Sequence, residues 1–152
     1  MQWPVCGTGI YLWRLTFHLL RGDTARMIST LSLVALGGAI GASLRFLFGV
    51  AVLRATGPTE FPVAILSVNI IGSFLMGAFV VAAAHKGLTH LSPFVMTGLL
   101  GGFTTFSAFS LETVTLMERG QFGSAGLYAV LSVVLSVLGL MLGLWLARGV
   151  FA

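Results

Sequence analysis

Residues Thr97 to Glu112 have the sequence T-G-L-L-G-G-F-T-T-F-S-A-F-S-L-E and lie within a long apolar segment. That segment runs over about residues 91–117, and as one straight helix its 27 residues would be roughly 40 Å long, against a bilayer core of about 30 Å. Its middle, residues 101–105, is Gly-Gly-Phe-Thr-Thr, where helix propensity is lowest. An interruption there would free backbone carbonyls and amides at mid-membrane depth, where such groups must be buried in protein, bind an ion or line a polar cavity. We therefore expect a third helix broken at its midpoint, and this point is the first candidate for function.

The composition is typical of a membrane protein. Of the 152 residues, 57% are hydrophobic and 8% are charged, against about 25% charged in soluble domains. Four apolar runs of spanning length predict one small all-α domain that crosses the cell membrane several times, with helices at about 28–53, 62–84, 91–117 and 122–147. The sequence has no glycine-rich phosphate-binding motif and no Cys/His cluster with metal-ligand spacing, and its net charge of +4 rests on only eight Lys and Arg. We therefore expect neither an enzyme nor a nucleic-acid-binding protein.

Residues 1–26 differ from the rest of the chain. They contain a short apolar stretch that Arg14 and His18 interrupt, too short to span a bilayer and without a small-residue cleavage site after it. This stretch suits either a helix lying on the membrane surface or a dispensable extension, and we favour the extension, with Met27 as an alternative start. The functional domain is then expected to comprise residues 27–152.

The charges between the spans predict no preferred orientation. Four spans place both termini on one side, where Lys86 and Arg148 lie, and the other side carries Arg54 and Arg119. Two basic residues on each side give the positive-inside rule nothing to act on. Such a chain can insert both ways and pair with an inverted copy, forming an antiparallel homodimer whose two-fold axis passes near mid-membrane, at the depth of residues 101–105. The three arginines of the N-terminal extension would make the count five against two, so this prediction requires that the extension plays no part in insertion.

The spans contain few polar side chains. Arg45 is the only charge in the first span and Asn69 the strongest polar group in the second, while Tyr128, Ser132 and Ser136 follow one another at spacing four in the fourth. That spacing places the three hydroxyls on one helical face, which suggests a polar track. Each residue also has a plainer role: Arg45 as an anchor of its helix, Asn69 as a contact between helices, and the serines bonded to their own backbone.

Two kinds of ion site are compatible with residues around the expected interruption. Phe106 and Phe109 share a helical face, and the positive edges of their rings can stabilise a small anion without a full charge, although ordinary packing also explains them. A strongly hydrated anion also needs hydrogen-bond donors that replace its lost water. Asn69, Ser107, Ser132 and Ser136 could supply them. Carbonyls freed by the interruption would instead suit a hard cation, and two inverted copies would join two sets of carbonyls on the axis.

Three motifs resemble one known family. G-G-F-T-T-F-S-A-F-S-L-E (Gly101 to Glu112), G-A-x-x-R-F (Gly41 to Phe46) and V-N-x-x-G-S-F (Val68 to Phe74) are similar to sequences of the CrcB/Fluc fluoride channels. The resemblance extends from about Met27 to the C-terminus, and the motif of the third span is the most specific part. It implies an antiparallel dual-topology homodimer with two fluoride pores and a central sodium ion that is structural and not transported.

The resemblance also implies roles for individual residues. The carbonyls of Gly101 and Thr104 would bind the sodium ion, Phe106 and Phe109 would be the pore phenylalanines, and Asn69 the pore asparagine. Ser132 and Ser136 would continue the polar track, with Ser107 and Tyr128 as further fluoride contacts and Arg45, Thr105 and Glu112 as supporting residues. The family often has a threonine four residues before the asparagine, where this chain has Ile65.

The sequence therefore favours a fluoride-selective channel that exports fluoride passively and so reduces its toxicity in the cell. One alternative is a small proton-coupled multidrug exporter, which also forms a dual-topology dimer of short helices but needs a titratable carboxylate in the core of a helix. The first two spans contain no acid, and Glu112 lies about eight residues past the expected interruption, or roughly 12 Å from mid-depth. A second alternative is a membrane subunit without transport activity, in which the polar side chains would only join helices.

Overall fold

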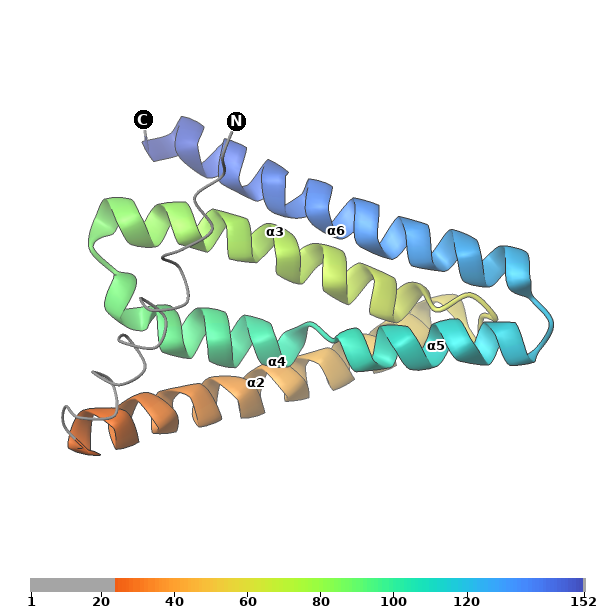
Figure 1. Cartoon of the computed structure of the whole chain (residues 1–152), viewed down its shortest axis with the longest axis horizontal. Helices are drawn as coiled ribbons and strands as arrows, with labels where there is room; N and C mark the ends of the chain where they lie inside the picture. Colours follow the sequence, from red (N-terminus) through yellow and green to blue (C-terminus); the bar gives the residue numbers. More distant parts are fainter. Residues whose placement is uncertain (1–23, 152) are drawn as a thin grey trace, which may run out of the picture.

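Four spans run side by side, each in the direction opposite to the one before it, in a computed structural model that describes residues 24–151 (Figure 1). All four are long and apolar enough to cross a membrane. Residues 1–23 of the predicted N-terminal extension lie outside the described residues. The first helix already begins at Thr24, so a start at Met27 would remove its first three residues.

The spans extend a few residues beyond the predicted boundaries. The first is α2 (Thr24–Thr56), the second α3 (Val63–Lys86) and the fourth α6 (Phe122–Phe151). The third consists of a 3₁₀ turn η1 (Thr89–Leu91), a π-helix η2 (Pro93–Leu100), a single α-helical turn α4 (Gly101–Phe103) and α5 (Phe106–Glu118). Helices need not stop at the edge of the apolar run, because the residues beyond it can lie in the polar interface of the membrane.

Glycine allows two pairs of spans to approach until their backbones touch. The first pair is α2 with η2 and α4: a methyl group added at Gly37 or Gly41 would collide with the backbone of the third span. From the opposite side, a methyl group at Gly102 would lie 2.6 Å from the carbonyl oxygen of Gly38. Small residues at spacing four on α2 thus serve close helix packing.

The second pair is α3 with α6. A methyl group at Gly77 would collide with the carbonyl of Leu140, and one at Gly143 with the carbonyl of Phe74. The α5 helix completes the bundle by packing against α6. The four spans therefore form two pairs in backbone contact, and the third span joins them.

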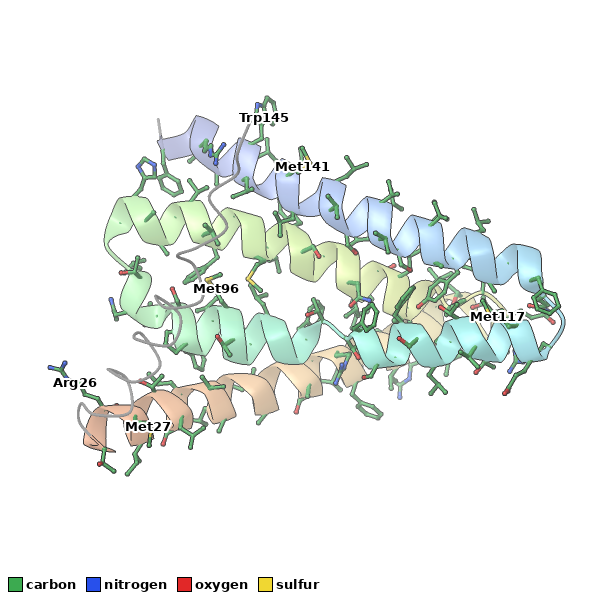
Figure 2. All side chains as sticks on the ribbon, in the orientation of Figure 1. Arg26, Met27, Met96, Met117, Met141 and Trp145 are labelled. Carbon is green, nitrogen blue, oxygen red and sulfur yellow. The ribbon has the colours of Figure 1, made fainter. Side chains whose placement is uncertain are left out.

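Outward-facing side chains are apolar over most of the bundle, which suits contact with lipid. Figure 2 shows Met141 and Trp145 pointing away from the other helices, and 70% of the Trp145 side chain is exposed. The buried core is small and centres on Leu116, Ala125 and Tyr128, where α5 meets α6.

Candidate functional site

Two residues of extended backbone separate α4 from α5. Thr104 has φ −78° and ψ 160°, and Thr105 has φ −155° and ψ 121°. The preceding glycines, which we expected to form part of the interruption, are helical: Gly101 has φ −64° and ψ −37°, and Gly102 lies within α4. The reason is packing, since Gly102 is needed for the close approach to Gly38, so the chain leaves the helix only at the threonines.

Asn69 on α3 holds the extended backbone through both of its polar atoms. Its Nδ2 donates to the carbonyl of Thr105 at 3.1 Å, and its Oδ1 accepts from the amide of Thr105 at 2.9 Å. A side-chain amide is suited to this pairing because it offers a donor and an acceptor side by side, like a backbone peptide group. These bonds agree with the plainer role considered from the sequence, in which Asn69 joins two helices, and the pore role of Asn69 stays a prediction.

Thr105 caps the helix that follows. Its Oγ1 accepts a hydrogen bond from the amide of Ala108 at 3.2 Å, the usual arrangement of a threonine N-cap. The same hydroxyl pairs with the hydroxyl of Ser107 at 3.2 Å, and Thr105 is only 9% exposed. Threonine three residues before Ala108 was the available sequence signal for this cap.

The side chains of Asn69 and Thr105 bind two backbone amides that would otherwise donate to carbonyls of the third span. In a continuous α-helix the amide of Thr105 would bond to the carbonyl of Gly101, and that of Ala108 to the carbonyl of Thr104. Here Asn69 takes the first amide and the hydroxyl of Thr105 takes the second. The two carbonyls deprived in this way are those that the family resemblance implies as sodium ligands.

Arg45 approaches the interruption from α2. Its Nη1 donates to the carbonyl of Thr104 at 3.4 Å, a long hydrogen bond. The arginine is half-buried, so it has found a polar partner within the bundle and does not only anchor the end of its helix. Among residues 24–151 no group of three or more His, Cys, Asp or Glu could hold a metal ion, so a cation at this point would be held by backbone oxygens.

A cavity of about 380 Å³ lies beside the interruption, between α3, α5 and α6. It is lined by five of the predicted anion contacts, namely Asn69, Phe106, Phe109, Ser132 and Ser136. The other lining residues are both threonines of the interruption, Gly72 and Ser73 of the V-N-x-x-G-S-F motif, and four residues that the sequence did not single out, Met76, Val133, Val137 and Leu140. Gly72 has a steric reason for its place, because a methyl group there would collide with the methyl group of Thr104.

Aromatic rings continue from the cavity into the core. The ring centroids of Phe106 and Phe109 are 5.3 Å apart, and those of Phe109 and Tyr128 are 5.5 Å apart. Phe61 meets Tyr128 edge to face at 5.7 Å. Phe106 is 77% exposed, whereas Tyr128 is fully buried, so the row of rings leads from the surface of the chain to its interior.

Two hydroxyls of the predicted polar track have no hydrogen-bond partner within the described part of the chain. They are those of Tyr128 and Ser132, both buried and one helical turn apart on α6. Buried hydroxyls normally have a partner, and Ser132 lines the cavity, so its hydroxyl is available to water or to an ion there, whereas Tyr128 is not among the lining residues. Ser132 does not bond back to its own helix, which removes the plainer role considered from its sequence position.

Five predicted site residues do not line the cavity, namely Arg45, Gly101, Ser107, Glu112 and Tyr128. Ser107 faces outward, with its hydroxyl on Thr105, and Glu112 is half-buried on α5 nearly two helical turns beyond the interruption. Ile65, at the position where the family often has threonine, is half-buried on α3 one turn before Asn69. Ser107, Glu112 and Ile65 therefore do not contribute to the cavity within a single chain.

Comparison with known proteins identifies the family. The family profile described as "CrcB-like protein, Camphor Resistance (CrcB)" matches residues 32–144. A protein of Roseobacter denitrificans is 71% identical over 125 residues, which cover 82% of this chain and 99% of the relative. A protein of Ruegeria sp. is 72% identical over 82% of this chain and 98% of the relative, and one of Jannaschia sp. is 79% identical over 60% of this chain and 88% of the relative.

All three relatives carry the name "Fluoride-specific ion channel FluC". Their matches and the four apolar helices establish a multi-pass protein of the bacterial cell membrane. This chain belongs to the CrcB family.

Proposed function

We propose that this chain forms a fluoride-selective channel that lets fluoride leave the cell passively. The observation that carries the proposal is the cavity beside the interruption, where two phenylalanines, one amide and two serine hydroxyls of three different spans face one space. Relatives that align over nearly their whole length are named for the same ion.

The chemistry of the cavity lining suits a small anion that must move on. Ring edges and hydroxyls attract an anion weakly, and no Lys or Arg is among the residues that line the cavity. A fixed cation would bind the anion tightly and slow its exit, which conduction does not tolerate. The hydroxyl of Ser132 has no partner among the described residues, so it is a donor that can replace lost water.

A passive path is sufficient for export because of the acid chemistry of fluoride. Neutral HF crosses membranes, dissociates inside and leaves fluoride trapped unless an anion path exists. Efflux through such a path runs down the electrochemical gradient without a coupled energy source.

The exporter alternative lacks a feature that it needs. Proton-coupled exchange of a cation requires a carboxylate that can bind either ion in turn, and the cavity lining contains no Asp or Glu. Glu112 lies well past the interruption on α5.

We further propose an antiparallel homodimer, because polar backbone groups at mid-membrane must be shielded from lipid. Gly101 is exposed at the depth where its carbonyl has lost its amide donor, and the ring of Phe106 next to it is 77% exposed. A second copy inserted in the opposite direction would present the same depth to this surface. The basic residues at the two ends of the bundle (Arg26, Lys86 and Arg148 against Arg54 and Arg119) differ by only one among the described residues, a weak bias for one orientation.

The proposed dimer includes a structural sodium ion at its centre. The carbonyls of Gly101 and Thr104 from each copy would hold it, since hard oxygen atoms without amide donors suit a small hard cation. Once bound, the ion supplies a fixed positive charge at mid-membrane that lowers the cost of an anion nearby and joins the two copies.

Fluoride and chloride efflux from vesicles that contain the purified protein tests the proposed function. We expect fluoride to leave rapidly and chloride to remain. Equal release of both ions, or release of neither, would rule out a fluoride-selective channel.

A further inference from the structure

The interruption of the third span is kept open by side chains, not by its own backbone. Thr104 and Thr105 occupy ordinary extended conformations, which any residue adopts without strain. Asn69 makes two hydrogen bonds to the backbone of Thr105, and the hydroxyl of Thr105 makes a third to the amide of Ala108. Without these three bonds, both amides would be free to return to the carbonyls of Gly101 and Thr104 and close the helix.

The membrane setting makes that return favourable. A buried backbone group without a partner costs free energy, and the hydrocarbon core offers no water to replace one. The carbonyls of Gly101 and Thr104 can bind a cation only while their amides are engaged elsewhere, and at Thr104 the cation would also replace the long 3.4 Å hydrogen bond from Arg45. The bonds made by Asn69 and Thr105 therefore favour an open segment with a cation site over a closed helix.

We propose that Asn69 is a positioning residue of the cation site as well as a wall of the anion cavity, and that Thr105 assists it. The inference rests on the structural sodium of the proposed function. The amide of Asn69 has a second Nδ2 hydrogen beyond the one given to Thr105, and the residue lines the cavity. One side chain thus touches both the expected anion path and the backbone that would hold the cation, so the two sites share a support.

The expected effect follows from the population of the open form. When only a fraction of the protein is competent to bind, the apparent affinity falls by that fraction. Loss of the hydrogen bonds made by either side chain should therefore raise the sodium concentration needed for a given increase in unfolding temperature about tenfold, the factor that corresponds to roughly 1.4 kcal/mol.

Thermal unfolding of the purified full chain, titrated with sodium chloride against N-methylglucamine chloride, measures this without reference to transport. Asn69→Ala removes the two bonds to Thr105, and Thr105→Val removes the capping hydroxyl while keeping the shape of the side chain. Thr105→Ser retains the hydroxyl and should restore the wild-type sodium curve. Thr115→Val is the matched control, because the hydroxyl of Thr115 bonds only within α5, to the carbonyl of Leu111.

We expect Asn69→Ala and Thr105→Val to shift the sodium curve to higher concentration, while Thr105→Ser and Thr115→Val leave it unchanged. A wild-type sodium curve in Asn69→Ala would overturn the inference and leave the fluoride channel untouched. Should that variant not fold, Thr105→Val decides by the same criterion. If the wild type itself is not stabilised by sodium, the structural ion of the proposed function fails, and fluoride efflux then shows separately whether the channel survives.

Discussion

The paired spans and the interruption keep their geometry by different means. Along α2 and the first half of the third span, glycines place backbone directly on backbone, and the same holds between α3 and α6. At Thr104 and Thr105 the backbone is extended, and hydrogen bonds from the side chains of Asn69 and Thr105 hold it in place. The difference shows how a membrane protein can keep an irregular segment at mid-depth. Dense packing of the spans on both sides makes the segment rigid, and hydrogen bonds from neighbouring spans satisfy its polar backbone groups.

The glycine contacts should give the largest effect on stability. Gly41→Ala places a methyl group in the backbone of the third span and should lower the free energy of unfolding by about 2–3 kcal/mol. Gly38→Ala is the matched control, since a methyl group there meets nothing within 4 Å. Alanine lowers the backbone entropy of the unfolded chain, so the free energy of unfolding should stay unchanged or rise slightly. Thermal unfolding in detergent compares the two. Equal loss in both variants would show that the pair is not held by close backbone approach.

Gly72 tests the point where the two regions meet. Gly72→Ala should cost about 1–2 kcal/mol, because its new methyl group collides with that of Thr104. Thr104→Ser removes that methyl group and keeps the hydroxyl that bonds to the carbonyl of Leu100. The double variant should therefore recover most of the loss in the same unfolding assay. Additive losses would mean that the two residues do not compete for this space.

The ring row tests the cavity, and Phe106, which is 77% exposed, does so with less effect on packing than Phe109, which also contacts the core. Phe106→Ile or Phe109→Ile should lower fluoride efflux from proteoliposomes at least about tenfold, since the aliphatic side chain has no positive ring edge. The proposed homodimer should still form. Phe122→Ile is the control, because that ring lies at the start of α6 away from the cavity and should not change efflux. Normal efflux in both cavity variants would remove the role assigned to the rings.

The N-terminal residues should give the smallest effect. Deleting residues 1–26 also removes the first three residues of α2, and efflux should stay within about twofold of the full chain, the range of a surface change of about 0.5 kcal/mol. Efflux from proteoliposomes again provides the measurement. An inactive truncation would show that these residues contribute to function or insertion.

Much of this arrangement follows from local sequence patterns. Apolar runs predict the four spans because length and hydropathy alone determine whether a helix suits a bilayer. Spacing four on α6 places Tyr128, Ser132 and Ser136 on one face, and the structure brings Ser132 and Ser136 to the cavity and Tyr128 next to Phe109.

Other features depend on contacts between spans, which periodicity cannot reveal. The low helix propensity of residues 101–105 predicts an interruption, but Gly101 and Gly102 are helical, with Gly102 against the backbone of Gly38 on α2, and only the two threonines interrupt the helix. Asn69 suggested a pore donor, and its bonds to Thr105 depend on the packing of α3 against the third span. Nothing in the sequence indicated the π-helix, because its wider turns arise from packing and not from a residue preference.

That π-helix, η2, affects how the third span can vary in length. Its hydrogen bonds close five residues apart, so one residue could be lost between Pro93 and Leu100 while ordinary α-helical bonds took over, leaving everything downstream in the same rotational phase. Neither an α-helix nor the two-residue link before Phe106 can lose a residue in this way, since a deletion there would turn the remaining span by about 100°. Insertions and deletions in related chains should therefore gather on the η2 side of the threonines.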